Sequence, residues 1–93
     1  MGRGKASKRR LIENFDDFSI PMPWDDFEYI MTKHFKFEMD ENTGSNARSF
    51  TRENETFTAY KPHGRKRIEK NVHISDRKKA RDALRRLGLL SEE

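Results

Sequence analysis

The chain has 93 residues, of which 32% are hydrophobic and 39% are charged, so it can form one small domain with a thin apolar core. It contains no cysteine, which excludes disulfide scaffolds and thiolate metal sites and is typical of a reducing, cytoplasmic environment. No apolar stretch is long enough for a membrane span or a signal peptide, and the net charge of +4 favours a polyanionic partner.

The charge is distributed unevenly along the chain. Residues 1–10 carry five basic side chains and no acid, whereas residues 11–41 carry nine acidic side chains against two basic ones. Residues 42–93 carry thirteen basic against seven acidic side chains. A solvated surface explains many charge runs, but such segregation in a small domain favours a directional anion-binding surface.

The first part of the chain predicts a tail, an extension and a helix. Residues 1–10 have no apolar pattern and are typical of a flexible basic tail. Residues 11–22 form an N-terminal extension, either a short helix or a strap packed on the domain. A helix is predicted over residues 23–34, because Pro23 suits a first helical turn and an apolar stripe follows, Trp24, Phe27, Ile30 and Met31.

The middle of the chain predicts three strands. Alternating apolar and charged side chains predict the first strand over residues 35–39, and residues 40–45 are typical of a turn. Residues 47–52 and 56–60 predict the second and third strands, separated by a tight turn. Because the connections are short, the three strands should form an antiparallel meander.

A second helix should follow the sheet. Ser75 resembles an N-cap with Asp76 in the first turn, and Gly88 lies where a C-terminal glycine is expected. An apolar stripe runs along this helix, Ala80, Ala83, Leu84 and Leu87. The sequence therefore predicts an α+β fold of order α-β-β-β-α, with two helices packed on one face of a three-stranded antiparallel sheet.

The loop over residues 61–70 places a histidine in the most cationic stretch of the chain. RNA cleavage through the 2′-hydroxyl needs a base and cations but no metal, so His63 is a candidate base. In the alternative interpretation the loop only binds phosphate and His63 does no chemistry. We expect no cofactor, no metal and no small-molecule ligand. The phosphate-binding candidates here and in the second strand are Arg48, Lys61, Arg65, Lys66, Arg67 and Lys70.

The second helix adds further basic candidates. Lys78, Arg81 and Arg85 share one helical face by their spacing, and we count Lys78 and Arg81 as phosphate-binding candidates. Arg77 and Lys78 lie near the helix N-terminus, where the helix dipole attracts phosphate. An ordinary solvated helix surface is the alternative. The element order with a basic final helix is also that of double-stranded-RNA-binding domains.

Assembled in order, these pieces resemble the HicA-like toxins, the mRNA interferases of bacterial toxin–antitoxin pairs. The matching residues are His34-Phe35, Thr43-Gly44-Ser45-Asn46-Ala47, Lys61-Pro62-His63-Gly64, and Leu84 with Gly88-Leu89-Leu90. The resemblance implies a double-stranded-RNA-binding-like domain over residues 23–90 that cleaves mRNA without a metal. It also implies RNA contacts at Gly44 and Ser45, and a HicB-like antitoxin as the protein partner.

One position departs from the family pattern. The family has a catalytic histidine just after the Gly-Ser pair, where this chain has Ala47, or Asn46 in a shifted alignment. A methyl group cannot accept a proton. The chain is therefore an inactivated toxin, a subfamily in which His63 supplies the base, or a non-catalytic relative that binds RNA or a protein partner.

Overall fold

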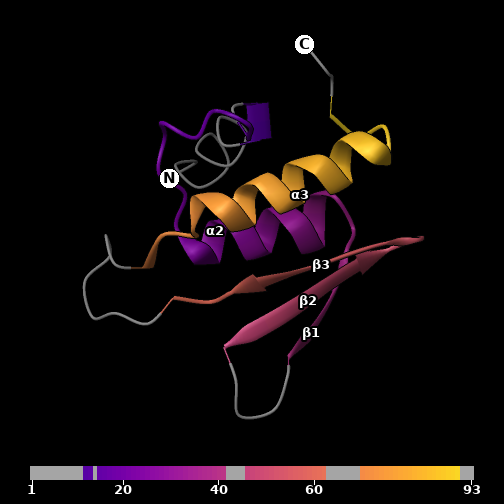
Figure 1. The fold of residues 1–93 in the computed structure, drawn as a ribbon, viewed down its shortest axis with the longest axis horizontal. Coiled ribbons are helices and arrows are strands. Elements are labelled where there is room, and N and C mark those ends of the chain that lie inside the picture. Colours follow the sequence, from indigo (N-terminus) through magenta and orange to yellow (C-terminus); the bar gives the residue numbers. More distant parts are fainter. Residues whose placement is uncertain (1–11, 14, 42–45, 63–69, 91–93) are drawn as a thin grey trace, which may run out of the picture.

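The structure is a computed structural model that describes residues 12–13, 15–41, 46–62 and 70–90 (Figure 1). Its antiparallel sheet has its strands in chain order, β1 (Glu38–Glu41), β2 (Ala47–Arg52) and β3 (Glu55–Tyr60). One face of the sheet is covered by helices, which are α2 (Trp24–Tyr29), its continuation η1 (Ile30–His34), and α3 (Ile74–Arg86). This helix–three strands–helix arrangement confirms the predicted α+β fold.

The helix predicted before the sheet forms as two continuous segments. Pro23 is the extended N-cap residue, and two acidic side chains, Asp25 and Asp26, occupy the first turn of α2, where the helix dipole favours them. The last turn widens to π-helical geometry, in which the Phe35 N–H donates to the carbonyl of Ile30 at 2.9 Å.

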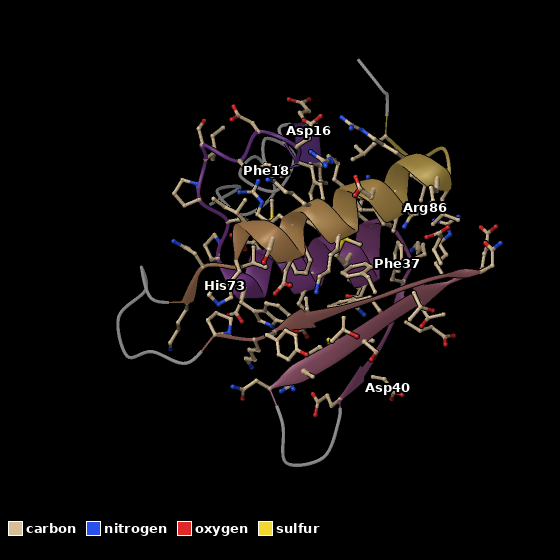
Figure 2. The ribbon with its side chains drawn as sticks, viewed as in Figure 1. Asp16, Phe18, Phe37, Asp40, His73 and Arg86 are labelled. Carbon is tan, nitrogen blue, oxygen red and sulfur yellow. The ribbon has the colours of Figure 1, made fainter. Side chains whose placement is uncertain are left out.

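The first strand begins three residues later than the alternation predicts, so the boundaries of 35–39 are wrong. Lys36 adopts a left-handed φ of 63°, and the Phe37 N–H donates to the carbonyl of Met31 at 2.9 Å. This turn buries both Phe35 and Phe37, which produces the same alternation as a half-buried strand. Figure 2 shows Phe37 between the helices and the sheet.

The hairpin between β2 and β3 fixes the register of the sheet. The second strand has the predicted bounds, whereas the third begins at Glu55, because the loop has two residues, Glu53 and Asn54. Phe50 pairs with Phe57 across these strands, and their rings stack with centroids 5.2 Å apart. Both rings point towards the helices and form the centre of the core.

The N-terminus of α3 differs from the sequence prediction, whereas its C-terminus agrees with it. The helix starts at Ile74 with His73 as its N-cap and no side-chain capping bond, so the predicted N-cap at Ser75 is wrong. The predicted C-terminal glycine is confirmed, since Gly88 has φ 75°. Its N–H donates to the carbonyl of Arg85 at 3.0 Å, and the Leu89 N–H donates to that of Leu84 at 2.8 Å, which is the Schellman pattern.

The extension packs beside α3 as a strap (Figure 1). Phe15 and Met22 are fully buried and belong to the same core as the helices and the sheet. The Val72 N–H donates to the carbonyl of Met22 at 2.9 Å, and Pro23 bridges to Asn71. These contacts tie the end of the strap to the segment that leads into α3.

Candidate nucleic-acid interface

The C-terminal end of β3 lies against the first turns of α3. The Tyr60 N–H donates to Oδ2 of Asp76 at 3.0 Å, and Oδ1 of Asp76 pairs with Nζ of Lys79 at 3.3 Å. Nζ of Lys79 also donates to the carbonyl of Thr58 at 3.1 Å. Asp76 is buried between the two elements. Its hydrogen bond to the edge strand β3 fixes the first turn of α3, where no serine side chain caps the helix.

Four lysines belong to the segments that meet near this junction, and we call them the cationic end. Lys61 follows β3 directly, and Lys70 comes shortly before α3. Lys78 and Lys79 lie in the first half of α3, beyond His73, which marks the start of the helix in Figure 2. All four side chains are exposed, and Lys78 makes no ion pair with any residue that the structure describes. Three of the predicted phosphate-binding residues therefore gather at one end of the domain.

The second half of α3 has its cations neutralised by the chain's own carboxylates. Arg85 pairs with Asp16 of the strap at 3.3 Å, and Arg86 pairs with Glu55 of β3 at 2.9 Å. These arginines are held by acids that the sequence places 69 and 31 residues earlier. Lys79 also pairs with Asp76, so within the described residues Lys78 is the exposed cation of α3 that has no ion pair.

Arg81 does not join the cationic end, although its spacing predicts a shared face with Lys78. Its side chain is half-buried, pairs with Asp82 at 3.1 Å and lies over the Phe18 ring at 5.3 Å. Phe18 belongs to the strap and sits beside α3 in Figure 2. One turn after the exposed Lys78, the side chain of Arg81 therefore packs against the strap.

Arg77 is unavailable to a phosphate, although it lies near the N-terminus of α3. The side chain is 2% exposed, and its guanidinium donates to the carbonyls of Ile20 at 2.7 Å and Phe15 at 3.0 Å. Burial lowers the pKa of Arg77, while the Asp17 carboxylate opposes this shift. Arg77 is therefore an anchor for the strap.

Ala47 and Arg48 point to opposite faces of the sheet. The register places Ala47 opposite Tyr60 on the face away from the helices, and Arg48 shares the side of Phe50. Arg48 is half-buried and donates from Nη1 to the carbonyl of Ala47 at 3.2 Å. The position aligned with the family histidine therefore lies on the face away from the helices, opposite the exposed Tyr60, and is itself buried.

Six of the predicted site residues lie outside the described residues: Gly44, Ser45, His63, Arg65, Lys66 and Arg67. Asn46, which follows the first of the two segments, and Lys61, which lies two residues before the second, are described. The Lys61 N–H donates to the carbonyl of Asn46 at 3.0 Å. The segments that contain the six residues therefore both connect to the cationic end, and the role of His63 stays a prediction.

Tyr60 is a candidate that the sequence reasoning missed. Its ring is 50% exposed, and Nζ of Lys79 lies 5.9 Å from the ring centroid. The sequence did contain an indication of this, because Phe57 and Ala59 predict which side chains of β3 face the core. Since side chains alternate along a strand, Tyr60 should then point outward.

Two further findings concern the described part of the chain. No helix in it is long and apolar enough to cross a membrane. Within the same residues, no group of three or more His, Asp or Glu side chains is arranged to hold a metal ion.

No family model matches the sequence, and comparison with curated proteins and solved structures finds no match. The likeness to HicA-like toxins therefore depends on the sequence motifs of this chain alone.

Proposed function

We propose that the protein binds RNA through the cationic end. The observation that carries this proposal is the contrast along α3, where Lys78 is exposed and unpaired in the described chain while Arg85 and Arg86 are held by carboxylates.

RNA is the polyanion that the element order favours. Double-stranded-RNA-binding domains share the order α-β-β-β-α and contact the backbone and 2′-hydroxyls of RNA. The HicA-like resemblance points to the same ligand, with mRNA as the substrate. A HicB-like antitoxin with an acidic surface would complement the cationic end and compete with RNA for it.

The proposal extends to RNA cleavage through His63. A base must remove the 2′-hydroxyl proton, and cations must stabilise the charge that develops on the phosphate. Ala47 cannot supply the base. His63 lies two residues after Lys61 in sequence, so the chain offers a histidine adjacent to the cationic end.

Fluorescence anisotropy with a labelled single-stranded RNA tests the binding. Log K should fall linearly with log salt, by about 0.7 for each phosphate contact. The double variant Lys61→Ala/Lys78→Ala should bind more weakly and reduce the slope by about 1.4, because two contacts are lost. The matched control is Lys33→Ala/Lys36→Ala, which removes the same charge from exposed lysines before β1. Equal losses in both variants, or no binding by the wild type, would refute the proposal.

Incubation of labelled RNA in EDTA tests the cleavage. The wild type should cut the RNA, and His63→Ala should bind it without cutting. A gain of cutting in Ala47→His would support the alignment with the family histidine. If RNA is bound but cut by neither the wild type nor Ala47→His, the protein is an RNA-binding module and the catalytic part of the proposal fails.

A further inference from the structure

Tyr60 combines an exposed aromatic ring with neighbouring cations at the end of the sheet. We propose that its ring stacks on an unpaired base, so that the RNA bound at the cationic end is single-stranded. This inference rests on the proposed RNA binding and deepens it by naming the class of RNA.

The ring of Tyr60 points away from the helices. Phe57 and Ala59 of β3 are buried beneath the helices, and Phe57 pairs with Phe50 on that face. Side chains alternate along a strand, so Tyr60 points to the opposite, open face of the sheet. Its ring is 50% exposed there, which leaves aromatic surface for a ligand.

A second feature is that the backbone of Tyr60 is fixed on both sides. One neighbour is Ala47 of β2 in the antiparallel register, and the other is Asp76 of α3, which accepts the Tyr60 N–H at 3.0 Å. A ring on a rigid strand loses little conformational freedom when a base stacks on it.

A third feature is the charge around the ring. The exposed Lys61 is the next residue in the chain, and Nζ of Lys79, which also pairs with Asp76 at 3.3 Å, lies 5.9 Å from the ring centroid. The β1 side of the same face carries exposed acids, Glu38 and Asp40, the latter on the side of the sheet away from the helices in Figure 2. A polyanion is therefore attracted to the C-terminal end of β3, where Lys61 lies, and repelled from β1.

Together these features favour an unpaired strand over a duplex. Bases inside an A-form duplex are stacked on one another, so their faces are closed to a protein ring, and duplexes are recognised mostly by shape and backbone. Proteins that bind single strands combine cations for the backbone with aromatic rings for the bases. Tyr60 with Lys61 and Lys79 is such a combination.

The test compares a labelled oligouridylate with inorganic polyphosphate, which carries the charge without the bases. Tyr60→Ala should weaken oligouridylate binding by about 5- to 150-fold, the range for loss of one stacked base. It should leave polyphosphate binding unchanged. Tyr60→Phe keeps the ring and should bind both ligands as the wild type does. Tyr29→Ala, which removes a 48% exposed tyrosine from α2, should have no effect on either.

The outcomes separate this inference from the proposed function. Equal oligouridylate binding by wild type and Tyr60→Ala, with a loss in Lys61→Ala/Lys78→Ala, would overturn the stacking role and leave the RNA binding intact. A loss of polyphosphate binding equal to that of oligouridylate in Tyr60→Ala would also overturn it. If the wild type binds neither ligand, the inference and the proposed function both fail, and the open face is left to a protein partner. Amide spectra of each variant establish that the fold is retained.

Discussion

Nη1 of Arg77 in α3 donates a 2.7 Å hydrogen bond to the carbonyl of Ile20, which lies 57 residues earlier in the chain. The same guanidinium donates to the carbonyl of Phe15 at 3.0 Å and lies over the Phe18 ring at 5.1 Å. These contacts join the strap to the helix that carries the cationic end. The strap is thus a structural part of the domain and places Asp16 beside Arg85.

Replacing Arg77 should destabilise the fold strongly. Arg77→Ala leaves the buried carbonyls of the strap without donors, at about 1–3 kcal/mol for each unsatisfied group, so a total loss of about 3 kcal/mol or more is expected. Urea unfolding followed by the fluorescence of Trp24, the single tryptophan and a buried one, measures this loss. The control Lys78→Ala should stay within about 0.5 kcal/mol of wild type. Similar stability of both variants would show that the strap is not anchored by Arg77.

Removing the Phe15 ring tests whether the strap belongs to the core. Phe15 is fully buried, and its ring stacks on Phe27 with a centroid distance of 6.2 Å. Phe15→Ala should lower the free energy of unfolding by about 3–5 kcal/mol, the usual cost of emptying an aromatic core site. Phe18→Ala, at a partly exposed position of the same strap, should cost less. The same urea titration measures both, and a Phe15→Ala protein of wild-type stability would contradict the core assignment.

Acid should weaken the strap through Asp17. The Ser19 hydroxyl, at 2.6 Å, and the Ser19 N–H, at 3.1 Å, both donate to Oδ1 of Asp17 and lower the pKa of that carboxyl below its ordinary value of 3.8. A lowered pKa in the folded state stabilises the protein above the unfolded pKa, and this contribution disappears as the pH falls through the folded value. Unfolding measured at pH 5 and at pH 3 should therefore show a smaller difference in Asp17→Asn than in the wild type. An equal difference in both proteins would contradict this role.

Gly88 should tolerate no side chain without strain. Its φ of 75° is left-handed, and no heavy atom lies within 4 Å of the position that a Cβ would take. Gly88→Ala should therefore lose about 1–2 kcal/mol from backbone strain alone. Gly88→Asn should lose less, because asparagine tolerates this conformation. Thermal unfolding compares the two variants, and a larger loss in the asparagine variant would refute the explanation.

The element order and the bounds of β2 could be predicted from the sequence, because the local hydrophobic pattern there fits only one structure. The second strand has its predicted bounds because Phe50 anchors it in the core and the two-residue loop Glu53-Asn54 follows its last residue. The first strand was misplaced because the turn at Lys36 buries Phe35 and Phe37 in the same alternation as a strand. The hydrophobic pattern does not indicate that Lys36 has a positive φ, so the turn could not be predicted from it.

The candidate site could be predicted only in part, because charge in a sequence does not reveal its partners. Lys61, Lys70 and Lys78 are exposed at one end, as a basic surface requires. Arg77 and Arg85, from the same basic helix, are held by the strap through contacts that span more than 50 residues. No local signal distinguishes these arginines from solvated ones.

Amide chemical-shift mapping of the full chain with single-stranded RNA tests the central claim most directly. The account predicts that the largest changes fall on the cationic end and the strand ends beside it, at residues 46–48, 59–61 and 70–79. Residues of η1 and of the second half of α3, where Arg85 and Arg86 are paired, should change little. Shifts concentrated on η1 or near Arg86, with the cationic end unchanged, would contradict the account.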